Sequence, residues 1–182
     1  MAALYNHIQS GNLDADIAVV ISNKPEAKGL EFASEKGIKT IVVEQKEFES
    51  KEAYEAEIAN QIESHGVELV VLAGYMRVLG DAFIERFENK IVNIHPSLLP
   101  AFKGLDAQKQ ALDYGVKIAG CSVHFVDTTL DGGPIIMQDA VDVLDTDTES
   151  SLSERILEKE HQLYAKAIQW VIETKLPEWR TK

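Results

Sequence analysis

One stretch constrains the fold of this chain more than any other, residues 93–100 with the sequence Asn-Ile-His-Pro-Ser-Leu-Leu-Pro. An apolar run from residue 90 ends in His95, and a proline on either side of Ser-Leu-Leu interrupts regular structure. The run predicts a buried strand with Asn93 and His95 at its carboxyl end, the end where open α/β sheets bind ligands. Residues two apart on a strand point to one face, so the amide and the imidazole should meet at one spot. Such a pair can hold and protonate a developing oxyanion.

Strand and helix signals alternate along the rest of the chain. Further strands are predicted at residues 17–21, 38–43, 69–74, 121–126 and 135–143. Helices are predicted at residues 2–9, 25–37, 50–66, 81–87, 106–114 and from 148 onward. The continuous apolar run at 17–21 is typical of a strand that is covered on both faces. This order predicts an α/β fold with a mostly parallel twisted sheet, helices on both faces, an antiparallel edge pair near the C-terminus and a long C-terminal helix.

Length and composition indicate one domain over residues 1–182, because no repeat, low-complexity tract or linker divides the chain. The net charge of −12 argues against a nucleic-acid or anionic-membrane surface as partner. No apolar run approaches the roughly 20 residues of a membrane span, and residues 1–7 lack the features of a secretion signal. The single cysteine, Cys121, excludes an internal disulfide and fits a reducing cytoplasm, and its apolar surroundings favour a core residue over a nucleophile.

His95 is the best candidate for a general acid or base, because imidazole titrates near neutral pH. Asp131 stands before Gly132 and Gly133 in a Gly-Gly-Pro turn, where it is either a plain turn residue or a carboxylate that orients the imidazole and keeps it charged. The two glycines would let the backbone approach a ligand closely. Ser122 and His124 alternate on one strand face, and either a supporting role behind the site or a core role fits them.

Two other kinds of chemistry find little support. The five histidines include no His-x-x-x-His pair and have no cysteine at zinc spacing, so no metal site is expected. A covalent serine enzyme is not expected either, because the chain has no Gly-x-Ser-x-Gly turn.

Four segments together resemble the phosphoribosylglycinamide formyltransferase family. They are residues 93–100 with 73–77 (Ala-Gly-Tyr-Met-Arg), 122–126 (Ser-Val-His-Phe-Val) and 130–136 (Leu-Asp-Gly-Gly-Pro-Ile-Ile). These motifs occur in the right order over nearly the whole chain. The family moves a formyl group from 10-formyltetrahydrofolate to the amine of glycinamide ribonucleotide in purine synthesis, without a metal or a covalent intermediate. The resemblance implies that Asn93, His95 and Asp131 are the catalytic residues.

The resemblance also implies contacts with both substrates. Asn93 and protonated His95 would stabilise the oxyanion, by roughly 3–4 kcal/mol per donor in a well-formed site, while Asp131 keeps His95 charged and helps relay the proton to the leaving nitrogen. The residues expected at the folate are Lys51, Met76, Arg77, Val78, Leu79, Asn93, Asp127, Thr128, Thr129, Leu130 and Asp131. Glu160 and Ser97 are expected at the ribonucleotide, although Glu160 would otherwise read as one more solvated acid on an acidic helix.

The chain departs from the family at its start. The family opens with a strand and a Gly-x-Gly-Ser-Asn loop that wraps the substrate phosphate, and Met1 falls just after the place where that loop ends. The missing strand would lie inside the sheet, between the strands at 17–21 and 69–73. We therefore expect an N-terminally shortened member that keeps the folate-side chemistry in outline and binds the ribonucleotide weakly. Asp106 stands where some members carry histidine and is given no catalytic role.

Three other functions are alternatives to the phosphoribosylglycinamide formyltransferase. A formyltetrahydrofolate hydrolase shares the catalytic core, but an additional N-terminal regulatory domain would be expected. A methionyl-tRNA formyltransferase shares the Ser-Leu-Leu-Pro loop, but it would need a further C-terminal domain and a basic tRNA surface. An inactive folate-binding remnant is the non-enzyme alternative. Both a monomer and a homodimer fit the sequence.

Overall fold

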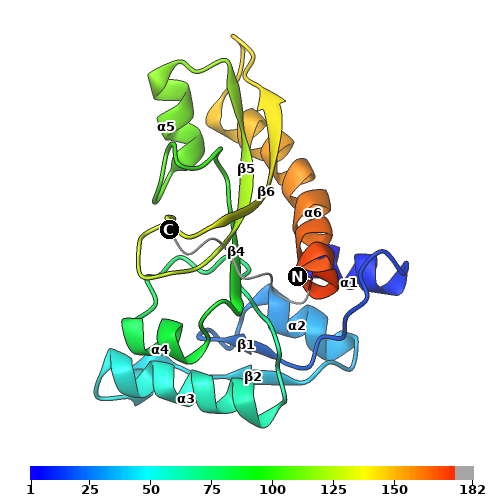
Figure 1. Cartoon of the computed structure of the whole chain (residues 1–182), viewed down its shortest axis with the longest axis vertical. Helices are drawn as coiled ribbons and strands as arrows, with labels where there is room; N and C mark the ends of the chain where they lie inside the picture. Colours follow the sequence, from blue (N-terminus) through cyan, green and yellow to red (C-terminus); the bar gives the residue numbers. More distant parts are fainter. Residues whose placement is uncertain (175–182) are drawn as a thin grey trace.

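The structure is a computed structural model, and it describes residues 1–174. Its helices are α1 (Ala2–Gln9), α2 (Lys28–Glu35), the 3-10 turn η1 (Gln45–Glu47), α3 (Lys51–Ser64), α4 (Asp81–Arg86), α5 (Ala107–Tyr114) and α6 (Glu149–Glu173). Its strands are β1 (Val20–Ser22), β2 (Thr40–Val42), β3 (Val70–Val71), β4 (Ile91–His95), β5 (Ile118–Phe125) and β6 (Ile135–Asp142). The α/β class and the long C-terminal helix are thus confirmed (Figure 1). The helix predicted from residue 148 onward corresponds to α6.

The strands form two separate sheets. β1 and β2 pair in parallel, and the second sheet has the order β3-β4-β5-β6. β3 and β4 are parallel, whereas β5 is antiparallel to both β4 and β6. The antiparallel part is therefore three strands wide, one more than the predicted edge pair, because β5 returns beside β4 before the chain turns into β6.

The first strands are shorter and more exposed than the sequence predicted. Residues 17–21 were expected to be covered on both faces, but only Val20–Ser22 is a strand, and its three residues are half-buried. β3 spans two half-buried residues of the predicted 69–74. The physical reason is that β1 and β3 lie in different sheets, so within residues 1–174 each has a strand neighbour on one side only.

The long helix α6 packs the main hydrophobic core against β4, β5 and β6 (Figure 1). It begins at Thr148, whose hydroxyl accepts from the amide of Ser151 while the Ser151 hydroxyl accepts from the amide of Thr148. Five apolar residues at helical spacing on α6 are all buried: Leu152, Ile156, Leu163, Ala167 and Val171. The helix therefore presents one continuous face to the sheet behind the carboxyl end of β4.

A smaller cluster joins α3 and α4 to the first residues of β4. Its buried members are Ala59, Ile62, Leu79, Phe83, Ile84, Phe87 and Ile91. Ser50 is the N-cap of α3, and its hydroxyl accepts from the amide of Ala53 at 3.0 Å. No helix within residues 1–174 is long and apolar enough to span a bilayer.

Candidate active site

Four polar side chains meet on one face of the β4–β5 pair. In the antiparallel register Asn93 lies opposite His124, and His95 lies opposite Ser122. Directly opposite residues of an antiparallel pair are in contact range. Three of the four residues, His95, Ser122 and His124, are buried. The sequence prediction that Asn93 and His95 share a face is confirmed by this register, and β5 supplies a polar neighbour for each.

His95 is held at both ring nitrogens. Its Nε2 lies 2.9 Å from the carbonyl oxygen of Phe102, and its Nδ1 lies 3.5 Å from Oδ2 of Asp131. A carbonyl oxygen can only accept, so Nε2 carries a proton. The side chain of His95 is 7% exposed and that of Asp131 is 11% exposed. The predicted imidazole–carboxylate pair is therefore present, within ion-pair distance and largely shielded from water.

The turn that carries Asp131 is built for close packing. Asp131 has a positive φ of 45°, and its Oδ2 also accepts from the amide of Gly104 at 2.8 Å. A Cβ at Gly133 would collide with the carbonyl oxygen of Phe125, and one at Gly132 would collide with the hydroxyl of Thr129. We expected these glycines to admit a ligand. Instead they let the turn press against its own chain, which fixes the carboxylate of Asp131 beside β4.

The loop after His95 is held in place by hydrogen bonds to the hydroxyl of Ser122. That hydroxyl donates to the carbonyl of Ser97 at 2.6 Å and accepts from the amide of Leu99 at 2.9 Å. The side-chain amide of Gln138 donates to the same hydroxyl and to the carbonyl of Leu99. Ser97 itself is buried, and its hydroxyl donates to the carbonyl of Ala101 at 2.6 Å. Ser122 thus acts as a support of the loop whose Phe102 carbonyl contacts His95.

Helix α6 contributes two side chains near the end of β4. The buried hydroxyl of Tyr164 lies 2.7 Å from the carbonyl oxygen of Leu72 and 3.0 Å from that of Val92, where β3 and β4 stop pairing. Glu160 lies one turn earlier on the same helix. Burial raises the pKa of Glu160 to about 7. A carboxyl with this pKa changes charge near neutral pH, which an ordinary solvated acid would not do.

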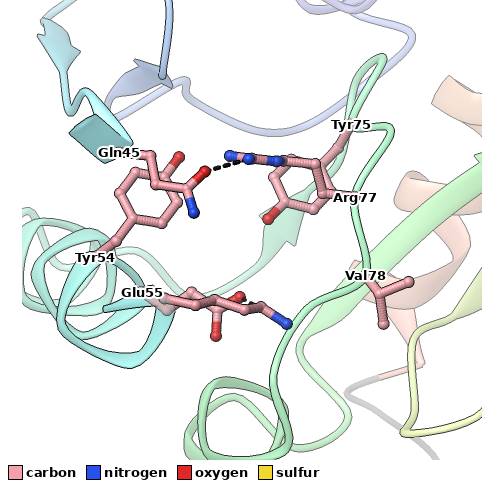
Figure 2. A pocket seen from close by; sticks show the side chains of 7 residues that line it. Gln45, Tyr54, Glu55, Tyr75, Arg77 and Val78 are labelled. Atoms are coloured by element: carbon pink, nitrogen blue, oxygen red, sulfur yellow. Dashed lines mark hydrogen bonds and ion pairs between the residues drawn. The ribbon is translucent and has the colours of Figure 1, made fainter. Parts of the chain in front are cut away.

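A cavity of about 350 Å³ opens between α3 and the loop that follows β3. It is lined by Gln45, Lys51, Tyr54, Glu55, Tyr75, Arg77 and Val78 (Figure 2). The guanidinium of Arg77 hydrogen-bonds Gln45 and lies over the ring of Tyr54, with 6.0 Å between Cζ and the ring centroid. Two cations, Lys51 and Arg77, therefore face the same space.

One buried acid forms the floor of this cavity. Both oxygens of Glu55 accept from the amide of Gly80 at 3.1 Å, and Nζ of Lys51 lies 3.6 Å away. Burial raises the pKa of Tyr75 to about 12, so its hydroxyl stays neutral and can donate. The cavity thus combines a neutral aromatic wall with two cations, of which only Lys51 has an acid partner among these lining residues.

The other residues expected at the folate lie in three places. Met76 and Leu130 are exposed on their loops, as a ligand contact requires, whereas Leu79 is buried in the α3–α4 cluster. Asp127 accepts from the amide and hydroxyl of Thr129, so it shapes the turn between β5 and Asp131.

Cys121 is fully buried and burial raises its pKa to about 12, which confirms a core role for the thiol. Within residues 1–174 no group of three or more His, Cys, Asp or Glu side chains is placed to hold a metal.

Comparison with known proteins agrees with this geometry. Residues 1–168 match a family described as formyl transferase. The phosphoribosylglycinamide formyltransferase of Bacillus subtilis is 43% identical over 170 residues, covering 93% of this chain and 87% of that protein. The chain belongs to the phosphoribosylglycinamide formyltransferase family. A solved member, glycinamide ribonucleotide transformylase 1 from Symbiobacterium toebii, superimposes with a TM-score of 0.91 at 46% identity, over 94% of this chain and 81% of that one.

The family also occurs inside longer proteins. The trifunctional purine biosynthetic protein adenosine-3 of Drosophila melanogaster is 46% identical over 160 residues, which cover 88% of this chain and 12% of that protein. This formyltransferase-family chain therefore spans about an eighth of the trifunctional relative, and only that part of it is comparable.

Sequence reasoning missed several supports of this formyltransferase site. Gln138 and Tyr164 hold the loop and the strand ends through contacts that span 39 and 92 residues of sequence. The spacing of residues within a short stretch of sequence does not predict contacts over such separations. The carbonyl of Phe102 was also missed, because a backbone acceptor carries no side-chain signal. Its residue has a positive φ of 53°, a conformation that cannot be read from a phenylalanine in the sequence.

Proposed function

We propose that this chain transfers the formyl group of 10-formyltetrahydrofolate to the amine of glycinamide ribonucleotide. The observation that carries the proposal is the meeting of Asn93, His95 and Asp131 at the carboxyl end of β4, with His95 and Asp131 3.5 Å apart and nearly dry. An amide donor, an imidazole and a carboxylate in this order suit acyl transfer through a tetrahedral oxyanion. Family membership supports the same reaction.

In this reaction the substrate amine attacks the formyl carbon, and the π electrons of the carbonyl move to its oxygen. Asn93 and protonated His95 donate hydrogen bonds to that oxyanion. When the oxyanion collapses, the bond between the formyl carbon and the folate nitrogen breaks, the amine gives up a proton and the leaving nitrogen gains one. Asp131 faces Nδ1 of His95 and stabilises the charged imidazole, so Nε2–H, which now donates to Phe102, is the donor that turns to the substrate.

The cavity between α3 and the β3–α4 loop is the proposed place for the formyl folate. Lys51 and Arg77 provide two positive charges for the carboxylates of the folate's glutamate end, and Arg77 is the better bidentate partner. Met76 and Val78, 81% and 62% exposed, offer apolar surface next to these cations. Asp127, Thr128, Thr129 and Leu130 lie on the turn that ends at Asp131, between this cavity's ligand and the catalytic residues in our proposal.

Glu160 is the proposed contact for the ribonucleotide. Its side chain is half-buried and makes no hydrogen bond to another residue within residues 1–174, and burial raises its pKa. Ser97, also expected at this substrate, instead uses its hydroxyl on Ala101 and supports the loop.

Tetrahydrofolate release from 10-formyltetrahydrofolate, measured with and without glycinamide ribonucleotide, tests the proposal. Release that requires the ribonucleotide is expected. Release that does not require it identifies a hydrolase, and no release in either mixture identifies a folate-binding remnant. Folding of the sample is checked by circular dichroism, so that loss of activity is not confused with loss of structure. The single buried thiol supports a reducing cytoplasm as the place of this reaction.

A further inference from the structure

His124 is a buried imidazole that the proposed reaction does not use directly. Its side chain is 3% exposed, and it lies opposite Asn93 in the β4–β5 register. Nε2 of His124 lies 3.3 Å from Nδ2 of Asn93, and Nδ1 of His124 lies 2.8 Å from the carbonyl oxygen of its neighbour Phe125. A buried polar ring with two partners has a restricted orientation, so it can impose one on its neighbours.

The two contacts together determine where the protons of His124 lie. The carbonyl of Phe125 only accepts, so Nδ1 must carry a proton. In the neutral ring Nε2 then has a lone pair and only accepts. Nδ2 of Asn93 can donate to this lone pair, whereas Oδ1 of Asn93 would meet it as a second acceptor and be repelled. A neutral His124 therefore permits one of the two amide orientations of Asn93 and disfavours the flipped one.

We propose that His124 is a positioning residue that sets the side-chain amide of Asn93 with its nitrogen toward β5. One N–H of Asn93 then donates a hydrogen bond to His124, and the planarity of the amide fixes the direction of the second N–H. That second N–H is the donor for the reacting carbonyl oxygen, so this inference rests on the proposed function for the identity of its target. Ser122 supports the loop beside His95 in the parallel way, two residues earlier on the same face of β5.

The charge of His124 decides whether this arrangement holds. Burial is the largest influence and lowers the pKa of His124, and the nearby charge of His95 lowers it too. The bond to the Phe125 carbonyl and the carboxylates of Asp131 and Asp127 act in the opposite direction, with Oδ1 of Asp131 3.8 Å from Nε2. The net direction keeps the ring neutral at neutral pH. Protonation would turn Nε2 into a donor, which pairs with Asp131 or with Oδ1 of a flipped Asn93.

A direct test observes the protons of His124 in the unaltered protein. Two-bond ¹H–¹⁵N spectra of the histidine rings, with the His124 signals assigned by their loss in His124→Gln, distinguish the tautomers and the charged ring. We expect a neutral ring protonated at Nδ1 at about pH 7.5. A ring that is charged at that pH, or protonated at Nε2, overturns the proposal. This readout needs no substrate, so it stands even if formyl transfer to glycinamide ribonucleotide is not observed.

A kinetic test asks whether His124 acts through Asn93. His124→Phe keeps the ring volume and removes the acceptor, and we expect it to lower kcat by about 10- to 100-fold, within the range for losing one oxyanion donor. The KM for the formyl donor should change little, because the lost interaction is made in the transition state. His124→Gln, which can offer an acceptor oxygen to Asn93, should recover most of the loss. In an Asn93→Ala background, His124→Phe should cost less than about threefold more.

Ser122→Ala is the matched control, because Ser122 has the same burial and the same strand face but supports a different loop. In the double variant with Asn93→Ala, the fold-losses in kcat of the two substitutions should multiply, as expected for independent effects. If His124→Phe and Asn93→Ala also multiply, or if His124→Gln is as poor as His124→Phe, the role of His124 is not exerted through the amide and the proposal fails. Equal unfolding midpoints for His124→Phe and His124→Gln would show that their difference in kcat does not come from a difference in stability.

Discussion

Replacing Ser122 by Ala is expected to destabilise the protein more than any other loss of one hydroxyl at this site. The hydroxyl of Ser122 takes part in three hydrogen bonds, with the carbonyl of Ser97, the amide of Leu99 and the side chain of Gln138. Ser122 is fully buried, and Ser97 and Leu99 are 2% and 4% exposed. Water therefore cannot easily replace the lost oxygen, and two backbone groups are left without this partner.

The magnitude follows from the number of groups left unpaired. A buried polar group that loses its partner costs about 1–3 kcal/mol, so two of them predict a loss of about 2–6 kcal/mol in the free energy of unfolding. Gln138 keeps its second bond, to the carbonyl of Leu99, and adds little. Ser97→Ala is the matched control. It removes one bond to the carbonyl of Ala101, an exposed residue, and should cost only about 0.5–1.5 kcal/mol.

The assay is urea unfolding followed by circular dichroism, with the free energy of unfolding taken by linear extrapolation for each variant. A loss for Ser122→Ala that is equal to or smaller than the loss for Ser97→Ala would refute the reasoning. Turnover provides a second readout. Since the same loop presents the Phe102 carbonyl to His95, Ser122→Ala should also lower kcat, while the KM for the formyl donor stays nearly constant.

Two further predictions concern the substrates. Burial raises the pKa of Glu160 to about 7, so its carboxyl loses its charge below that pH and the KM for the ribonucleotide should rise up to tenfold per pH unit. Glu160→Gln should abolish this pH dependence. A pH profile that is the same in Glu160→Gln would contradict a role for this carboxylate in binding. Lys51→Ala should raise the KM for formyl folate about tenfold, whereas Lys46→Ala, 75% exposed and paired with Glu44, should not; equal effects would exclude the cavity.

The centre of the molecule was predictable from the sequence because its signals are local. The apolar run before His95 and the proline after it are sufficient to place β4 and its polar end. The register that puts Asn93 and His95 on one face follows from the period of two along a strand. The stripe on α6 follows in the same way from the helical period, since Leu152 and Ile156 lie one turn apart and are both buried.

The edges and supports of the site were not predictable because they depend on distant partners. The run at 17–21 has the composition of a buried strand, but strand burial is decided by the neighbours on each side, and β1 has only β2 within the described chain. The role of Gly133 was misjudged for a similar reason. A glycine signals close approach but not which group approaches, and here that group is the carbonyl of Phe125.

An isotopically labelled formyl group shows whether the site at the carboxyl end of β4 transfers the group to the ribonucleotide. The chain is incubated with 10-formyltetrahydrofolate labelled in its formyl carbon and with glycinamide ribonucleotide, and the products are identified by mass spectrometry. We expect the label to appear on the amine of the ribonucleotide and His95→Ala to prevent this transfer. Label recovered as free formate, or transfer that persists undiminished in His95→Ala, would contradict a formyl-transfer site at the carboxyl end of β4.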